Sequence, residues 1–343
     1  MNNPSSTSLN VPFPYVVGRK FHVRSHVPPP PTPLKPGCCL ESDAGRLERQ
    51  KLHPIDRCLL HPPLAGSDGP MELDLEISWP LSVGRSNHRA QLVAVDVANA
   101  DEHAAVLGQG KRLVAKIYDP LYATAKDNDF DPFLLMDKNY THEAAAYTRL
   151  PELQGSSIPR YYGSFSLEIP TSRSMSRWIR LIMIEFIPGS PMQDIDPGSL
   201  SQYHRQRIMK TIIDFTTEIY QRDMVHEDLC PRNIMIINEG TKEQKVVFVD
   251  FEDMRFTRTA YGNPEQEARF FPKTYVSPLL KWHKARKPAY RFGGWVDWSW
   301  QRWLKDVYGH TENTITEEQR KKFLPDYLLK PTPIGRIEEL YLK

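Results

Sequence analysis

The sequence lacks any apolar run of the roughly 18 to 20 residues that a membrane span requires, and residues 1–10 contain no hydrophobic signal core. These absences predict no membrane partner and a cytoplasmic or nuclear location. An excess of charge of one sign is also lacking, because 44 basic and 42 acidic side chains give a formal net charge of +2. We therefore expect no general electrostatic attraction to nucleic acid.

Cysteine is scarce, with four in 343 residues. Cys38, Cys39, Cys58 and Cys230 show no paired metal-ligand spacing, and adjacent Cys38 and Cys39 are poorly placed for a disulfide with each other. We expect free thiols. The length and the 40% hydrophobic content suit one large or two medium globular units.

Regular patterning is also scarce in residues 1–70, which contain a proline run at positions 28–31 and a turn-rich stretch at positions 62–70. This composition predicts a proline-rich, largely flexible leader, serving either as a linker or as a docking segment.

From residue 71 the chain changes to short runs with β-strand patterning. Strands are expected at residues 73–79, 90–97, 113–118, 161–167 and 178–187, and a helix with apolar residues at helical spacing is expected at 133–150. Pro188 and Gly189 then break the chain. Residues 71–188 should thus form an antiparallel sheet carrying one helix, and residues 189–343 a mainly helical part that begins with an amphipathic helix at 200–221.

The segment after that helix has the pattern H-x-D-x-x-x-x-N, with His226, Asp228 and Asn233. Two apolar runs follow, at residues 234–237 and 246–249, and the second ends in Asp250. A hairpin would bring Asn233 and Asp250 together, and a carboxylate with an amide oxygen is the grouping that holds magnesium against a triphosphate. Asp228 is then placed to orient a hydroxyl acceptor. The alternative is that Asp228 and Asn233 only cap turns.

Phosphate oxygens also need a cation, and Lys116 lies inside an apolar strand-like run. A lysine there is either on a solvated face or paired. Glu143 on the next predicted helix, followed by three alanines that allow a close approach to the sheet, makes an ion pair feasible; otherwise Glu143 is a surface charge in an i,i+4 pattern. We favour the pair, which would direct the ammonium group toward the phosphates.

These residues resemble motifs of the protein kinase-like superfamily. Lys116 looks like the lysine of its third strand, Glu143 like the glutamate of its helix C, residues 226–233 like its catalytic loop, and residues 250–252 (D-F-E) like its metal-binding triplet. Residues 181–189 resemble the fifth strand and hinge, which implies adenine hydrogen bonds from the backbone of Glu185 and Ile187. ATP and Mg²⁺ are the cofactors that the resemblance implies.

Departures from the family pattern indicate which branches of the superfamily this sequence resembles. The D-F-E triplet is similar to that of the choline kinase and aminoglycoside phosphotransferase branch, which favours a small-molecule acceptor, whereas the hinge and overall spacing suit a protein kinase equally. Glu227 stands where many protein kinases have an arginine that receives an activation-loop phosphate. Residues 81–88 keep one glycine where the family expects three, and the tryptophan-rich segment 294–303 resembles in outline the tail of kinase-like proteins abundant in fungal genomes.

The sequence therefore predicts an α+β, two-lobed protein kinase-like fold. Residues 71–188 would form a β-rich nucleotide-binding lobe, and residues 189–343 a shortened, mainly helical catalytic lobe. The expected function is transfer of the γ-phosphoryl group of ATP to a protein or small-molecule hydroxyl. The alternative is a pseudokinase scaffold that keeps the fold without turnover, which the single glycine and the short tail support.

Overall fold

The computed structural model describes residues 12–34, 37–84, 90–100, 107, 112–123, 129–171, 175–256, 274–284 and 288–324. These residues form two compact units. The first contains the described residues up to Phe186 except Leu34 and Ser156–Ile158, and the second contains those exceptions and the chain from Ile187 onward. Among the described residues, no helix is long and apolar enough to cross a bilayer.

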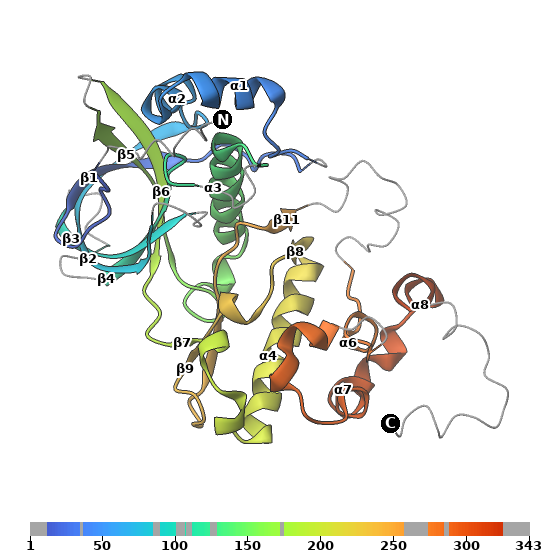
Figure 1. Ribbon diagram of the computed structural model, residues 1–343. Coiled ribbons are helices and arrows are strands. Elements are labelled where there is room, and N and C mark those ends of the chain that lie inside the picture. The colour runs from blue at the N-terminus through green and yellow to red at the C-terminus, as the bar shows by residue number, and fades with distance from the viewer. Residues whose placement is uncertain are drawn as a thin grey trace, which may run out of the picture. The chain divides into compact units, whose positions relative to one another are not determined.

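The first unit is built on six antiparallel strands that close into a barrel in the order β1-β2-β3-β4-β6-β5 (Figure 1). The strands are β1 (Lys20–Val27), β2 (Ser67–Ser82), β3 (Gln91–Ala100), β4 (Arg112–Tyr118), β5 (Tyr161–Pro170) and β6 (Ser176–Glu185). Five of them confirm the strands predicted from the alternation of apolar and polar residues.

The barrel core follows from that alternation. Leu73, Leu75 and Ile77 of β2 are each at most 2% exposed, and Val93 and Val95 of β3 are buried with them. Successive side chains of a strand point to opposite faces, so every second residue enters the core. Each such side chain contributes about 1.5–3 kcal/mol when fully buried.

The predicted antiparallel sheet needs a correction, because β1 pairs with both β2 and β5 and so closes the sheet. Residues 21–25 alternate toward the core, but their inward positions are Phe21, Val23 and Ser25, and the polar serine weakens the pattern. Strand β1 was therefore not predictable from the alternation of its residues.

The prediction of a largely flexible leader was also wrong for two helices, α1 (Asp43–Lys51) and α2 (Pro54–Leu60). The side chain of Ser42 caps the N-terminus of α1. The side chain of His53 caps the N-terminus of α2, and Pro54 lies in the first turn of that helix. Helix α1 has no buried residue and α2 is only seven residues long, so neither shows a long apolar stripe. The capping residues Ser42 and His53 were the signal in the sequence that could have indicated these helices.

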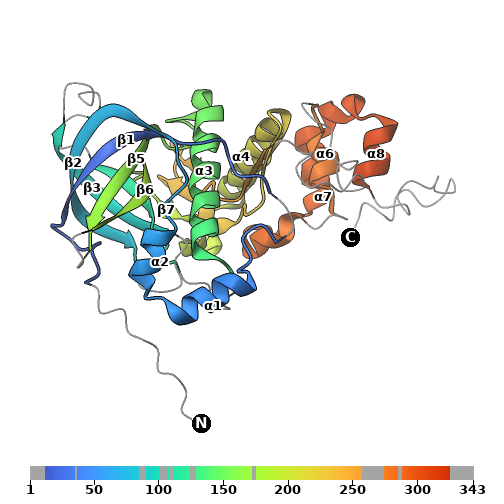
Figure 2. The same cartoon turned by 90° about the horizontal axis from the view of Figure 1, so that it is seen from above.

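Helix α3 (Pro132–Arg149) confirms the helix predicted in this unit and packs on the barrel strands (Figure 1). The carboxylate of Asp131 accepts hydrogen bonds from the backbone amides of Phe133 and Leu134, which fixes the helix start. Figure 2 shows α2 near the start of α3, where the guanidinium of Arg57 lies 5.1 Å from the ring centre of Phe133. A short 3₁₀ helix, Pro151–Leu153, follows.

The second unit contains two small sheets, β7 (Ser190–Pro191) with β9 (Ile234–Ile237) and β10 (Lys245–Phe248), and β8 (Met224–His226) with β11 (Met254–Phe256). Gly189 precedes β7, and a Cβ atom at this position would lie 2.5 Å from the carbonyl oxygen of Ile236. Only glycine allows that approach of the backbone to β9. Short 3₁₀ helices lie at Met192–Asp194, Pro197–Ser199 and Pro231–Asn233.

Helix α4 (Gln202–Gln221) confirms the predicted amphipathic helix and supplies much of the core of this unit. Ile208, Ile212 and Phe215 are buried, and the Phe215 ring stacks on Phe248 of β10 with centroids 3.8 Å apart. The remaining elements are α6 (Pro278–Lys281), α7 (Trp300–Tyr308), α8 (Glu317–Phe323) and 3₁₀ segments at Pro288–Trp295 and Gly309–Thr314.

The tryptophan-rich segment is a packing cluster where the structure describes it. The indole of Trp300 donates a hydrogen bond to the carbonyl of Trp282 at 2.9 Å, and its ring lies 5.1 Å from that of Trp303. The bond to Trp282, which directly follows α6, ties α7 to α6, as buried aromatic residues with a satisfied N–H commonly do.

Candidate active site

The candidate residues of the first unit are Lys116 on β4 and Glu143 on α3. Strand β4 pairs with β3 and β6 on its two sides, which places Lys116 in a central strand with 4% of its surface exposed. Its Nζ atom lies 2.6 Å from Oε2 of Glu143, whose side chain is fully buried. The predicted ion pair is thus confirmed, and the solvated-face and surface-charge alternatives are wrong. The role of the pair toward phosphates stays a prediction.

Small side chains allow α3 to carry Glu143 this close to the strand. Ala144 and Ala146, which follow it, are 2% and 0% exposed. A buried carboxylate without a counter-charge would be strongly destabilising, so Lys116 and Glu143 depend on each other.

Tyr118 is a third member of this group, and the sequence analysis missed it. Its hydroxyl donates to Oε2 of Glu143 at 2.8 Å, the same oxygen that Lys116 contacts. Tyr118 stands two residues after Lys116, so both side chains leave β4 on the same face. That i,i+2 spacing was the signal available in the sequence.

Two candidate residues of the second unit, Asp228 and Asn233, lie on the loop between β8 and β9. Asn233 is 4% exposed, and its Nδ2 donates to the backbone carbonyl of Asp228 at 2.9 Å and to Oδ2 of Asp228 at 3.1 Å. Arg232 donates to the same Oδ2. These contacts hold the Asp228 side chain on one edge, through Oδ2. Its Oδ1 lies 4.0 Å from the Cys230 sulfur, and burial, followed by the charge of Asp228, raises the pKa of the Cys230 thiol.

The hairpin predicted from residues 234–249 is confirmed by antiparallel pairing of β9 with β10. Just beyond the paired residues, the Val249 amide donates to the Asn233 carbonyl at 3.0 Å. Asp250, the next residue, has φ 66°, in the left-handed region that non-glycine residues rarely adopt. The backbone therefore turns sharply where the carboxylate of Asp250 leaves the strand.

Buried rings flank the candidate residues in the chain. His226 packs edge-on against Phe251 with centroids 5.5 Å apart, and Phe251 is fully buried. Burial lowers the pKa of His226, while the charge of Asp250 opposes that shift, so the imidazole is neutral near pH 7. A neutral ring is the form that packs without desolvating a charge.

Two arginines brace the same loop. Arg255 of β11 forms an ion pair with Glu227. Arg291 donates to the backbone carbonyls of Glu227 at 3.1 Å and Leu229 at 3.3 Å. The sequence analysis singled out Glu227 but missed both partners, since neither lies at a spacing that links it to the loop.

The candidate adenine-binding residues lie at the end of β6 (Glu185) and two residues beyond it (Ile187). The backbone amide of Glu185 donates to the carbonyl of Arg160 at 2.9 Å, and the carbonyl of Ile187 accepts from the amide of Gly189 at 2.9 Å. Glu185 also pairs with Leu113 in the ladder between β6 and β4. The glycine-poor loop is only partly visible, because its residues 85–88 lie outside the described residues.

Comparisons with known proteins identify the region that carries these residues. Residues 111–261 match the family model described as the ABC1 atypical kinase-like domain, and this segment includes Lys116, Glu143, Asp228, Asn233 and Asp250. The search of curated proteins found no match.

Two of the similar solved structures are mutant forms of the PknI kinase domain from Mycobacterium tuberculosis. Each is 14% identical to this chain over 52% of its length, with a TM-score of 0.34. The matches cover 58% and 60% of those kinase domains, so this chain spans less than two thirds of either.

Proposed function

This chain belongs to the protein kinase-like superfamily through its domain at residues 111–261, and on that premise we propose that it is an ATP- and magnesium-dependent phosphotransferase. The acceptor would be a hydroxyl group of a protein or a small molecule. Lys116 and Glu143 would position the phosphates, Asn233 and Asp250 would hold the metal, and Asp228 would orient the acceptor.

The observation that carries this proposal is the buried ion pair between Lys116 and Glu143. A lysine on a central strand, held at 2.6 Å by a glutamate on the neighbouring helix, is the arrangement that kinases require before they can use ATP. A buried pair of apolar residues is often as stable as a buried ion pair. A scaffold that never binds nucleotide would therefore gain nothing from the charges of Lys116 and Glu143.

The chemistry of the second unit's loop fits a magnesium ion. Magnesium prefers oxygen ligands, and Asn233 donates its Nδ2 to Asp228, so its amide oxygen is the atom that would face a metal. Asp250 would add a carboxylate oxygen. When bound, such an ion would neutralise charge on the phosphate oxygens.

Asp228 has the geometry of a group that orients an acceptor. Its Oδ2 is held by Asn233 and Arg232, which fixes the carboxylate plane. Its Oδ1 is then the atom that would accept a hydrogen bond from the incoming hydroxyl and take its proton late in the transfer. The proposal assigns the adenine contacts to the carbonyl of Glu185 and the amide of Ile187.

The test is ATP turnover by the wild type and by Asp228→Asn, which keeps the size of the side chain and one acceptor oxygen for Asn233 and Arg232 but removes the charge and the second acceptor. We expect the variant to lose about 10²- to 10⁴-fold in kcat while its melting temperature stays within about 2 °C of the wild type. ATP should stabilise both proteins against heat, and more strongly with magnesium.

Two outcomes would overturn the proposal in different ways. Stabilisation by ATP without turnover would support the pseudokinase alternative instead. No stabilisation at any ATP concentration would remove nucleotide binding altogether. Where turnover is found, phosphorylation of hydroxyl-bearing metabolites compared with generic protein substrates would decide the acceptor class.

A further inference from the structure

Chain segments that precede the matched domain contact helix α3 of the first unit. The ABC1 family model begins at residue 111, whereas three earlier stretches, residues 28–32, 37–41 and 61–64, form hydrogen bonds with α3 or with the residue that caps it. Figure 2 shows the chain after β1 passing over α3. We call these three stretches the N-terminal cover.

The contact at Thr32 uses both polar groups of its backbone. The Thr32 amide donates to Oγ1 of Thr141 at 3.3 Å, and the Thr32 carbonyl accepts from Nε2 of His142 at 2.9 Å. Thr141 and His142 are 0% and 2% exposed, so a lost bond would leave a buried polar group without this partner. Prolines at positions 31 and 33 restrict the backbone on both sides of Thr32 and favour an extended conformation there.

A second stretch of the cover is bonded to the start of α3. The amide of Asp131, the residue that caps this helix, donates to the Cys39 carbonyl at 2.9 Å. The Cys39 sulfur lies 3.9 Å from the backbone carbonyl of Leu134 in the first turn. Because Leu134 and Thr141 are about two helical turns apart, they lie on the same side of α3. The cover therefore follows this side of the helix over about two turns.

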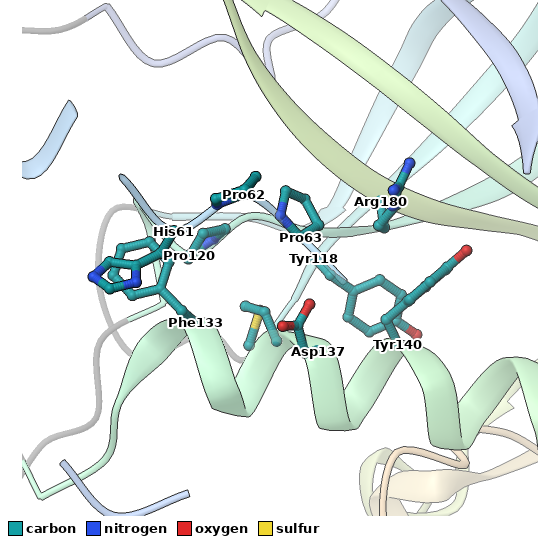
Figure 3. A pocket seen from close by; sticks show the side chains of 10 residues that line it. His61, Pro62, Pro63, Tyr118, Pro120, Phe133, Asp137, Tyr140 and Arg180 are labelled. Carbon is teal, nitrogen blue, oxygen red and sulfur yellow. The ribbon is translucent and has the colours of Figure 1, made fainter. Parts of the chain in front are cut away.

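The third stretch of the cover is the loop that follows α2. The amide of Leu64 donates to Oδ1 of Asp137 on α3 at 3.1 Å. Figure 3 shows Pro62 and Pro63 of this loop across from the α3 side chains of Phe133 and Asp137. The space left between the loop and the helix is large enough for only about one water molecule, so the two are closely packed.

Glu143 leaves α3 on a different side from the one that Thr32 contacts. Each residue of an α-helix turns by about 100°, so Glu143, which comes two residues after Thr141, lies on nearly the opposite side of the helix. There it forms the ion pair with Lys116 of β4. Helix α3 is therefore held by Lys116 on one side and by Thr32 on the other. Strand β4 is fixed by its ladders with β3 and β6, so α3 is the element whose shift would separate the pair.

We propose that the N-terminal cover positions α3 for nucleotide binding, with Thr141 and His142 as positioning residues that act through Glu143. Loss of either bond to Thr32 would populate a conformation in which α3 lies further from β4 and the ion pair is broken. The apparent affinity for ATP would then fall in proportion to the fraction of the protein that keeps the pair. The hold of the cover on α3 stands without the proposed function, whereas its effect on ATP rests on that function.

Hydrogen exchange of the full chain tests the hold of the cover on α3. His142→Phe keeps a flat ring but loses the donor to Thr32, and His142→Gln keeps a donor without the ring. We expect the amides of residues 139–147 to exchange at least about fivefold faster in His142→Phe than in the wild type, with His142→Gln close to the wild type. Amides of β2 and β3 are the internal reference and should exchange at unchanged rates. Faster exchange in His142→Gln than in His142→Phe would show that ring packing matters rather than the hydrogen bond, and would overturn the proposal.

A second pair of variants tests the other bond to Thr32 and decides the matter even if His142→Phe fails to fold. Thr141→Val keeps the shape of the side chain and removes the acceptor for the Thr32 amide, whereas Thr141→Ser keeps the hydroxyl. Thr141→Val should raise the exchange rate of the α3 amides, and Thr141→Ser should not. Equal exchange rates in the wild type and both Thr141 variants would overturn the hold of the cover on α3.

The effect on nucleotide is measured by titrating ATP with magnesium into the same four variants. The two variants that lose a bond to Thr32 should bind ATP at least about fivefold more weakly, and the two conservative variants should stay within about twofold of the wild type. Faster exchange of α3 with unchanged ATP affinity would refute the action through Glu143. If the exchange results hold and the wild type binds no ATP, the cover still positions α3 and the proposed function fails.

Discussion

The candidate residues of the two units are held differently. In the first unit, Lys116 and Glu143 are buried on a central strand and a helix, and each depends on the other's charge. In the second unit, Asp228 lies on a loop with 32% of its side chain exposed, and its partner Arg232 is 54% exposed.

The comparison distinguishes charged side chains that support folding from charged side chains that serve only chemistry. The buried pair contributes to folding as well as to chemistry, because removing either partner leaves a desolvated ion. The loop carboxylate contributes little to folding because water screens it, so it is free to serve chemistry alone. The following predictions test this contrast, starting with the largest expected effect.

Lys116→Met should lower the free energy of unfolding by about 3–5 kcal/mol, because it leaves the Glu143 carboxylate buried without its cation. Urea denaturation measures this change. The matched control is Arg177→Met, which breaks another buried pair of the same unit, Arg177 with Asp119, at 2.6 and 2.8 Å.

Both variants should be destabilised to a similar degree, but only Lys116→Met should lose ATP affinity in the folded protein. A Lys116→Met protein within about 1 kcal/mol of the wild type would contradict the view that the buried pair supports folding.

Asp137→Asn should change how stability depends on pH. The pKa of Asp137 is raised to about 6 by burial, so the folded state holds this proton more tightly than the unfolded state does. The stabilisation of the folded state by this proton is therefore full below about pH 4 and is lost as the pH rises through 6. The variant should gain about 3 kcal/mol relative to the wild type across that window.

Denaturant titrations at several pH values measure that gain. Parallel pH profiles for the two proteins would show that Asp137 titrates as it does in the unfolded chain.

Asp250→Ala should be less stable than Asp250→Gly by about 1 kcal/mol, because position 250 has φ 66° and glycine adopts this conformation without a steric penalty. Both variants lose the carboxylate, so the difference between them reports the backbone alone. Thermal melts of the two proteins give the comparison, and equal stability would argue against a left-handed backbone at this residue.

Arg232→Gln should change the free energy of unfolding by no more than about 0.5 kcal/mol, because its pair with Asp228 is largely exposed. Urea titration at low and high salt would measure it. A loss of unfolding free energy as large as that expected for Lys116→Met would contradict the view that the exposed pair contributes less to folding than the buried pair.

The strands and helices with strong periodicity were predictable from the sequence. The runs that became β2 to β6, α3 and α4 alternate or repeat over enough residues to be recognised. Strand β1 and helices α1 and α2 were not, because their apolar faces are short or interrupted and they acquire stability from the barrel and from α3.

The site was predictable to the extent that its residues follow a linear motif. Spacing placed Asp228, Asn233 and Asp250 on one loop and hairpin, and the lone lysine in a strand indicated the pair with Glu143. Tyr118, Arg255 and Arg291 were missed because their roles come from contacts across strands or over long stretches of chain. No local spacing marks contacts such as those of Arg291.

The closure of the barrel has a consequence for how the first unit meets other proteins. An open sheet ends in strands with unpaired backbone amides and carbonyls, and an extended peptide can add to such an edge. Here β1 bonds to β2 on one side and to β5 on the other, so the described strands form a continuous ring. Addition of a partner strand beside β2 or β5, at the place that β1 occupies, would therefore first require β1 to detach.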